Sequence, residues 1–600
     1  MYVSKIINKK TGRIFIQIVE SYRDVDKMTR HRVIQPLGYV DELEKQYDDP
    51  IVFFKLQAKE MTRQKNEEQA AVNISISPAS RLQKHDELNG SNRKNLGYAA
   101  LSSIYHELEI DYFLNNRRRY TKASYNHNAI FKLLVYDRIL FPSSKRGAWF
   151  QRQRFFEQMD FSLDDVYRSL DFFLTHRDHL LMAIHNKITK LYDRDTTLVY
   201  YDVTNYYFEI DREDELRKKG VCKEHRPNPI VQMGLFMDEH GLPITYGLYP
   251  GNTNDGTTLI PMMADLSYDF GMKEIIVVAD KGMMNGQNIS KIRLDHNGYV
   301  ISYSLRGAAE VFQEYVLDED GYADWGKDAK YKSRIQPRKI WITDSEGKKK
   351  KTTINERQIV FYSQKYADKA KRDREKAVNK ARDLVKNPAK YTKASLQGAA
   401  KYVSKLHYDE HGQVIKNVGT DIVFDEQKLQ KEELLDGYYV IMTNVIGTDQ
   451  KSPAFKGKSR YTIDGFFQLN RSVPDTDIIA MYKGLWKIEE TFKVTKSDLR
   501  TRPVYLSQED HIEAHFLVCF VALTILRVLE YQLGDKYCAS NIARSLEKAS
   551  GTLLEDGYYV FDYYDEVLEG IGKEFGLDFS RKYLKVGEIR KMMGKTKKTE

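Results

Sequence analysis

Cysteine is scarce in this chain of 600 residues, which contains only Cys222, Cys519 and Cys538. Three cysteines argue against a disulfide-built scaffold and against a cysteine-based zinc site. Long apolar runs are also missing, because the longest, Phe516–Leu526, is too short to span a bilayer and is typical of a buried helix. The first ten residues have no apolar core before their charges, so no signal peptide is expected. We therefore expect a soluble, cytoplasmic protein without membrane contact.

Positive charge is only slightly in excess. The chain has 94 Lys and Arg against 85 Asp and Glu, which gives a net charge of +9 and a pI near 8.9. This balance is compatible with nucleic-acid binding but does not establish it. The local basic clusters are Arg117–Arg119, Lys348–Lys351 and Arg590–Lys598. Each is either a solvated loop or chain end, or a DNA contact.

The segment from Tyr482 to Lys496 combines a phenol, a carboxylate and two ammonium groups. Glu489 lies seven residues after Tyr482 and seven before Lys496. Lys493 lies four residues after Glu489. In a single helix with 3.6 residues per turn, these side chains share one face. Such a face suits a metal-bound phosphate backbone, with the acid on the cation and the lysines on phosphates. The alternative is a solvated helix with acid–lysine pairs.

Two aspartates occupy strands in which solvated charges are not expected. Asp202 lies within Leu198–Phe208, a β-branched and aromatic run that predicts a strand buried on at least one face. Asp280 ends the apolar run Ile275–Asp280, at the carboxyl end where α/β sheets place ligands. A carboxylate inside a buried strand must be paired with a positive charge or bound to a metal ion, or its burial destabilises the fold. The alternative for each is a strand-end cap or a turn residue.

The elements around these aspartates follow a recognisable order of β-β-β-α-β-α-β. The expected segments are Leu198–Phe208, Ile230–Met237, Pro243–Tyr249, Leu259–Phe270, Ile275–Asp280, Asn288–Asp295 and Tyr299–Leu305. The helix that carries Glu489 comes much later in the chain. This order predicts an α/β fold of the ribonuclease-H-like type, a mixed sheet flanked by helices.

These residues together resemble the bacterial insertion-sequence DDE transposases that carry the signature Tyr-x2-Arg-x3-Glu-x6-Lys. Asp202, Asp280 and Glu489 match the three catalytic acids of that family, and Tyr482 and Lys496 match the signature at full spacing. Leu485 stands at the signature arginine, so the phosphate contact of that arginine is left to Lys483 or Lys487. Three further segments are similar to segments of these transposases: Lys223–Pro227, Tyr249–Thr253 and Arg502–Tyr505.

The resemblance implies the chemistry and the partners. The three acids would bind two Mg²⁺ ions about 3.5–4 Å apart, with Asp202 bridging both, and Mn²⁺ could substitute. Tyr482, Lys493 and Lys496 would contact DNA. The freed 3′ hydroxyl would then attack target DNA. The expected partners are the transposon ends and the target, and a homodimer is expected in the synaptic complex.

The chain is expected to divide into six regions. These are an amino-terminal hairpin and linker (1–95), a helical region that binds DNA ends (96–195), the first part of the catalytic core (196–305), a β-rich insertion (306–474), the second part of the core (475–535), and a carboxy-terminal helical region with a basic tail (536–600). The insertion is expected to form a separate unit, because the Glu489 helix belongs with the core sheet.

Two other readings of function remain open: a ribonuclease-H-like endonuclease without strand transfer, and a non-enzymatic DNA-binding relic. The Tyr and Lys side chains beside Glu489 favour a transposase over a simple nuclease, because they would grip a DNA end. A relic would be expected to lack an acid, and all three are present. His511 and His515 do not match the zincin spacing and are interpreted as ordinary helix residues. Trp486 is expected to pack its helix onto the sheet.

Overall fold

The computed structural model describes most of the chain. The described residues are 1–8, 11–23, 29–67, 92–223, 226–283, 285–344, 346–391, 394–396, 398–404, 407–408, 414–415, 422–450, 465–554 and 557–597. They belong to two compact units, Met1–Leu82 and Gln83–Glu600.

The first unit is a three-stranded antiparallel sheet with two helices. Strands β1 (Tyr2–Ile7), β2 (Ile14–Arg23) and β3 (Thr29–Tyr39) pair in sequence order, followed by α1 (Val40–Leu43) and α2 (Pro50–Glu67). Ile16 and Ile18 alternate along β2 and are fully buried, as a strand with one covered face requires. The expected hairpin is present and gains a third strand.

The second unit begins with a helical region. It contains β4 (Arg93–Asn95), α3 (Tyr98–Glu107), α4 (Ile110–Arg118), α5 (His127–Leu140), α6 (Lys145–Gln151), η1 (Arg152–Arg154), α7 (Leu163–Thr175) and α8 (Arg177–Tyr192). The long helix α16 (Glu509–Gln532) packs against α3, α5 and α7. Among the described residues α16 alone is long and apolar enough to cross a membrane, but 94% of that apolar window is buried inside the protein. Its placement is that of a core helix.

Acid should weaken this helical region through the buried His127. Its Nδ1 lies 3.0 Å from Ser169 Oγ, and its ring stacks on Phe172 with the centroids 4.0 Å apart. Burial, with repulsion from Arg118, lowers the pKa of His127 to about 4. Between about pH 6.5 and 4 the unfolded chain therefore binds more protons than the folded one, so stability falls as the pH drops, by at most about 3 kcal/mol. We expect His127→Gln to reduce the shift of the urea midpoint between these pH values, whereas the same change at the exposed His240 should not. An unchanged shift in His127→Gln would contradict this assignment.

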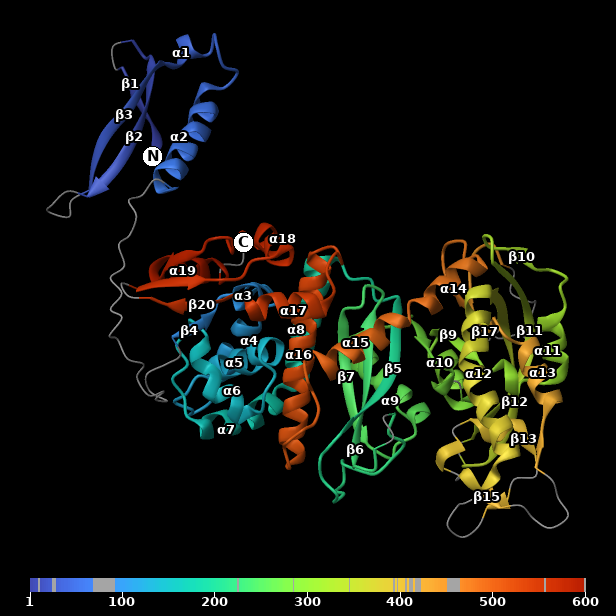
Figure 1. Ribbon diagram of the computed structural model, residues 1–600. Helices are drawn as coiled ribbons and strands as arrows, with labels where there is room; N and C mark the ends of the chain where they lie inside the picture. Colours follow the sequence, from blue (N-terminus) through green and yellow to red (C-terminus); the bar gives the residue numbers. More distant parts are fainter. Residues whose placement is uncertain are drawn as a thin grey trace. The chain divides into compact units, whose positions relative to one another are not determined.

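A nine-stranded mixed sheet forms the centre of the second unit (Figure 1). Its order is β10-β11-β12-β17-β9-β8-β5-β6-β7. Strands β5 (Leu198–Tyr207), β6 (Ile230–Asp238) and β7 (Pro243–Pro250) run antiparallel, and β8 (Ile276–Ala279) and β9 (Gly298–Tyr303) lie parallel to β5. The connecting elements are η2 (Asp255–Thr257), α9 (Leu259–Tyr268), η3 (Lys281–Met283) and α10 (Gly286–Leu294). The expected β-β-β-α-β-α-β order is confirmed, and with it the ribonuclease-H-like mixed sheet.

The expectation that residues 306–474 form a separate unit is wrong for the strands of that segment. Strand β17 (Tyr438–Thr443) pairs with the edge of β9, and the long hairpin of β11 (Ala329–Thr343) and β12 (Lys349–Ser363) continues outward to β10 (Ala323–Asp324). The physical reason is the open edge of β9, whose backbone groups need partners. These strands therefore extend the core sheet.

Other parts of this segment stand off the sheet. Helices α12 (Gln364–Lys386) and α13 (Glu426–Leu434) share a hydrophobic cluster of their own around Tyr402 and Leu384. The remaining elements are η4 (Leu305–Gly307), α11 (Glu310–Leu317), η5 (Pro388–Lys390), η6 (Ala394–Leu396), η7 (Ala399–Tyr402), β13 (Val403–Ser404), β14 (His407–Tyr408), β15 (Val414–Ile415), β16 (Val423–Phe424), β18 (Val445–Ile446) and β19 (Phe467–Gln468).

The carboxy-terminal region is mixed and not purely helical as expected. After α14 (Asp475–Lys483), α15 (Trp486–Ser497) and α16, it contains α17 (Ala539–Lys548), β20 (Ser550–Leu553), β21 (Tyr558–Phe561), α18 (Glu566–Phe575), β22 (Tyr583–Lys585) and α19 (Val586–Lys595). The order β22-β21-β20-β4 makes a four-stranded sheet. Because β4 joins this sheet, residues 93–95 belong with the carboxy-terminal region and not with the amino-terminal linker.

Candidate active site

Asp202 and Asp280 occupy neighbouring positions on two parallel strands. In the register of β5 and β8, Tyr201 pairs with Ala279, and Asp202 and Asp280 are the next residues on each chain. Paired residues of adjacent parallel strands point to the same face, with the strands about 4.8 Å apart. Burial raises the pKa of Asp202 to about 6, and the negative charges of Asp280 and Glu489 add to this increase. Both other acids therefore lie close enough to act on Asp202.

The carboxylate of Asp280 is held by the next strand. Ser302 on β9 donates a hydrogen bond from Oγ to Asp280 Oδ1 at 2.8 Å, and the backbone N–H of Lys281 donates to Ser302 Oγ at 3.0 Å. This chain orients one oxygen of Asp280, while the residue itself is exposed at the carboxyl end of β8. Sequence reasoning did not single out Ser302, because its partner becomes visible only when β8 and β9 lie side by side.

Glu489, and not Glu490, is the acid of α15 that belongs to this group. Glu489 lies exposed in the first turn of α15, which packs against β5. The carboxylate of Glu490 lies 3.8 Å from Arg527 Nη2 on α16, so it is directed into the helical region. The side-by-side placement of α15 and the β5–β7 strands is visible in Figure 1.

The expectation of a single helix from Tyr482 to Lys496 is wrong. Helix α14 ends at Lys483 and α15 begins at Trp486, with a tight turn at Gly484 and Leu485 between them. A Cβ at Gly484 would lie 1.9 Å from the hydroxyl of Tyr200, so only glycine permits this contact. Leu485, at the signature arginine position, is buried in the hydrophobic core.

Tyr482 still reaches the acids in spite of the break. Burial raises the pKa of its phenol to about 12, the nearby side chain of Ser302 opposes this increase, and the charges of Asp280 and Glu489 add to it. Helix α14 places it there by packing against β8 and β9. Tyr482 thus joins the acid group through Ser302 and not through a shared helical face.

The two lysines of α15 lie in different surroundings. Lys496 is half-buried, with its Nζ 5.6 Å from the ring centroid of Tyr206, and burial together with repulsion from Lys223 lowers its pKa to about 8. The negative charge of Asp202 partly opposes that effect, which places Lys496 near the acids. Lys493 is exposed, one turn earlier on the helix.

Lys483 and Lys487, the two residues that could replace the signature arginine, both contact groups outside the acid site. Lys487 donates from Nζ to the backbone oxygen of Glu239 at 2.5 Å, and Lys483 Nζ lies 4.1 Å from the ring centroid of Trp325. Trp486 is 57% exposed, so the expectation that it packs α15 onto the sheet is wrong.

Lys223 and Asp255 are site residues that sequence reasoning did not select. Lys223 donates from Nζ to the backbone oxygen of Val203 at 2.7 Å, and its positive charge lowers the pKa of Asp202. Burial raises the pKa of Asp255, an effect that Lys223 also opposes. The segment Lys223–Pro227, noted in the sequence as similar to the transposase family, did point to Lys223. Its Glu224 and His225 lie outside the described residues.

The donor set fits hard divalent cations, which prefer carboxylate oxygens. A cation would favour the charged form of Asp202, whose pKa is raised mainly by burial and further by repulsion from Asp280 and Glu489. Across the described part of the chain, no three His, Cys, Asp or Glu side chains converge on one point closely enough to hold a single ion. His511 and His515 make separate contacts, the first with Asp171 at 3.3 Å and the second with Lys145 at 2.9 Å.

Comparison with known proteins identifies the family of this chain. A model of the transposase DDE domain matches residues 209–525, which is more than half of the chain. The matched range contains Asp280 and Glu489. A model of the N-terminal domain of IS1634 family transposases matches residues 3–72. The chain therefore belongs to the DDE transposases of insertion sequences. It is an enzyme of DNA transposition that acts on DNA, and enzymes with this domain generally use divalent metal ions.

The likeness to solved structures is distant. This chain is similar to a piggyBac transposase synaptic complex with hairpin DNA, at 7% identity and a TM-score of 0.31, over 83% of this chain and 85% of that one. A likeness this distant supports no inference about the present chain. No curated protein matches it.

Proposed function

We propose that the protein binds the terminal inverted repeats of its element, cleaves the DNA, and joins the 3′ ends to target DNA by two-metal phosphoryl transfer. Asp202, Asp280 and Glu489 are the proposed metal ligands, with Mg²⁺ as the natural ion and Mn²⁺ as a substitute. The observation that carries this proposal is the adjacent register of Asp202 and Asp280, with Glu489 acting on the same carboxylate.

The proposed division of ligands assigns a different part to each acid. Two ions would need only Asp202 to contact both, with Asp280 and Glu489 each completing one, so the acids need not meet at one point. When bound, the ions supply charge stabilisation at the attacking and leaving oxygens. The chain itself contributes orientation: Ser302 fixes one oxygen of Asp280, and Tyr482 braces Ser302.

The lysines give the reason to favour a transposase mechanism over simple cleavage. Lys496 and Lys493 extend from the acids along α15, where they would bind the phosphates next to the scissile bond. A nuclease that releases its product needs no such grip, whereas strand transfer requires the 3′ end to stay bound for a second reaction. An assay that detects joined products as well as cut ends separates the two mechanisms. Cut ends without joined products would support the endonuclease.

We also propose that two copies of the chain act together in the cytoplasm, each holding one end of the element. The mass of the complex with end DNA, measured by light scattering, tests this directly. Two protein copies and two DNA ends are expected, and a complex of one copy with one end would contradict the proposal.

Removing Lys496 should weaken binding of end DNA and lower its dependence on salt. Each phosphate contact contributes about 0.9 to the slope of log affinity against log salt, so Lys496→Gln and Lys493→Gln should each reduce the slope by about that amount. Lys487→Gln is the matched control on the same helix, because Lys487 is bound to a backbone oxygen. Filter binding or fluorescence anisotropy over a salt series gives the slopes. Slopes equal to that of the unaltered protein would assign both lysines to the solvated surface.

A further inference from the structure

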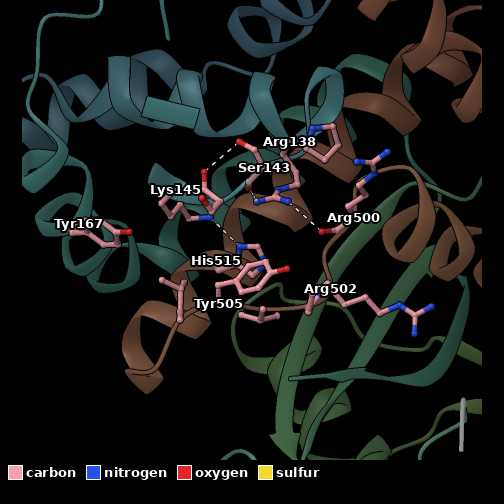
Figure 2. Close-up of a pocket in the computed structure, with 13 residues that line it drawn as sticks. Arg138, Ser143, Lys145, Tyr167, Arg500, Arg502, Tyr505 and His515 are labelled. Carbon is pink, nitrogen blue, oxygen red and sulfur yellow. Dashed lines mark hydrogen bonds between the residues drawn. The ribbon is translucent and has the colours of Figure 1, made fainter. Parts of the chain in front are cut away.

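A deep pocket outside the acid group is lined by positive charge. It has a volume of about 320 Å³ and lies between α5, α6, the start of α16 and the segment that follows α15. Its cationic side chains are Arg138, Lys145, Arg500 and Arg502. None of the described residues that line it is an Asp or a Glu. Figure 2 shows these side chains, with Lys145 and Arg138 near the middle of the view and the guanidinium groups of Arg500 and Arg502 extending to the right. Tyr167 lies at the left of the view and Tyr505 near its middle, close to the His515 label.

Lys145 is the buried charge at the base of this pocket. It is 4% exposed, and its Nζ lies 2.9 Å from His515 Nδ1. His515 Nε2 faces the backbone oxygen of Thr501 at 3.2 Å, and a carbonyl only accepts, so Nε2 carries the hydrogen. The Nδ1 atom is therefore the acceptor and Lys145 the donor. Among the described residues no carboxylate lies within ion-pair distance of Lys145.

Arg138 holds the outer wall of the pocket in place. Its guanidinium donates to the backbone oxygens of Leu499, Arg500 and Ser143 at 3.3, 3.2 and 2.7 Å. Its Nε is buried and has no hydrogen-bond acceptor in the described structure. Because a buried donor and a buried ammonium without an acid partner are both costly, the pocket has the properties of an anion site.

Asp137 is the acid whose charge acts on Lys145. Burial raises the pKa of Asp137 to about 7, Lys145 partly opposes that increase, and Ser143 donates to Asp137 from Oγ at 2.8 Å. Burial and repulsion from Arg138 lower the pKa of Lys145 to about 7, an effect that Asp137 partly opposes. A bound anion would favour the charged form of Lys145.

Strand β5 connects the acids to this pocket through its last residues. The guanidinium of Arg502 lies 5.3 Å from the ring centroid of Tyr207, the last residue of β5. Its neighbour Tyr206 hydrogen-bonds Thr495 at 2.8 Å, next to Lys496. Five residues of β-strand separate Asp202 from Tyr207, or roughly 17 Å, which is about five nucleotides of a B-form strand.

From this geometry we propose that the pocket binds a backbone phosphate of the DNA, about five nucleotides from the phosphodiester at Asp202. This inference rests on the proposed function, since it takes the acids as the site of cleavage. Lys145 supplies a buried point charge, and Arg500 and Arg502 supply planar donors that match phosphate oxygens.

The test uses full-length protein carrying Asp202→Asn, so that DNA is bound but not cut. Arg500→Gln and Lys145→Gln should each lower the affinity for end DNA at least severalfold and reduce the salt slope by about 0.9. Lys573→Gln is the control, because Lys573 is exposed and pairs with Glu569. Arg500 is exposed, so its variant keeps the test valid if Lys145→Gln does not fold.

A scan with single methylphosphonates locates the phosphate. One neutral linkage about five nucleotides from the cut should weaken binding by the unaltered pocket, with no further loss in Arg500→Gln. The proposal is overturned if the variants keep the original affinity and slope, or if inorganic phosphate stabilises the protein while no single neutral linkage matters. Cleavage by Asp202→Asn would instead refute the proposed function and leave the pocket result standing.

Discussion

Asp202→Asn should abolish DNA cleavage while leaving the binding of end DNA nearly unchanged. Asp202 lies beside Asp280 in the strand register, and the charges of both Asp280 and Glu489 act on it, so its loss would affect both proposed ions. Each metal ion contributes several kcal/mol of transition-state stabilisation, so the expected loss is on the order of a thousandfold or more. Affinity should persist, because phosphate contacts by lysines and arginines supply most of it. Single-turnover cleavage of labelled end DNA measures the effect.

The loss of cleavage in Asp202→Asn should not result from a loss of folding. Burial raises the pKa of Asp202 to about 6, so the neutral amide relieves a cost and should not lower the melting temperature. A matched pair on α15 supplies the control: Glu489→Gln should lose cleavage, whereas Glu490→Gln, whose carboxylate faces Arg527, should stay within a few fold. Full cleavage by Asp202→Asn would remove Asp202 from the mechanism.

Asp238→Ala should cost about 3–5 kcal/mol of unfolding free energy, because it leaves a buried guanidinium without its partner. Arg194 Nε lies 2.7 Å from Asp238 Oδ2, and the two side chains are 1% and 0% exposed. Asp238 Oδ1 also accepts from the backbone N–H groups of His240 and Leu242 at 3.0 and 2.9 Å. The pair joins the segment between α8 and β5 to the end of β6, and so it supports the strand that carries Asp202. Urea unfolding at neutral pH gives the difference.

Two further variants distinguish the charge of Asp238 from its hydrogen bonds to the turn backbone. Asp238→Asn keeps an oxygen for the two backbone donors but removes the charge, so most of the loss should remain. Glu569→Ala breaks an exposed pair with Lys573, which solvent screens, so it should change the unfolding free energy far less. A loss of that small size for Asp238→Ala would show that Arg194 finds water or another acceptor.

The sequence predicted the parts of the fold that depend on local pattern. Alternating and apolar runs located β5 to β9, and an aspartate inside or just after such a run indicated the site. The expectation for residues 306–474 failed because strand patterns say that β11 and β12 form, but not which edge they join. Pairing of β17 with β9 depends on contacts between residues more than a hundred positions apart.

Side-chain detail failed for the same reason. The helix breaks at Gly484, where Tyr200 of β5 leaves no room for a side chain, and no periodicity of the segment itself reveals this contact. The pocket around Lys145 draws its lining from several separated segments, of which the sequence marked only Arg502–Tyr505. A residue whose role needs a partner from elsewhere in the chain, such as Ser302, becomes visible only after folding.

The central claim is that these three carboxylates perform metal-dependent cleavage and joining. The most direct measurement is the reaction of full-length protein with DNA that carries the element's own ends and with a target plasmid, in Mg²⁺, Mn²⁺, Ca²⁺ or excess chelator. We expect cut ends and joined products with Mg²⁺ and Mn²⁺, binding with little cleavage in Ca²⁺, whose larger and looser coordination spoils the close geometry, and neither product with chelator. Cleavage and joining that persist in excess chelator would contradict the account.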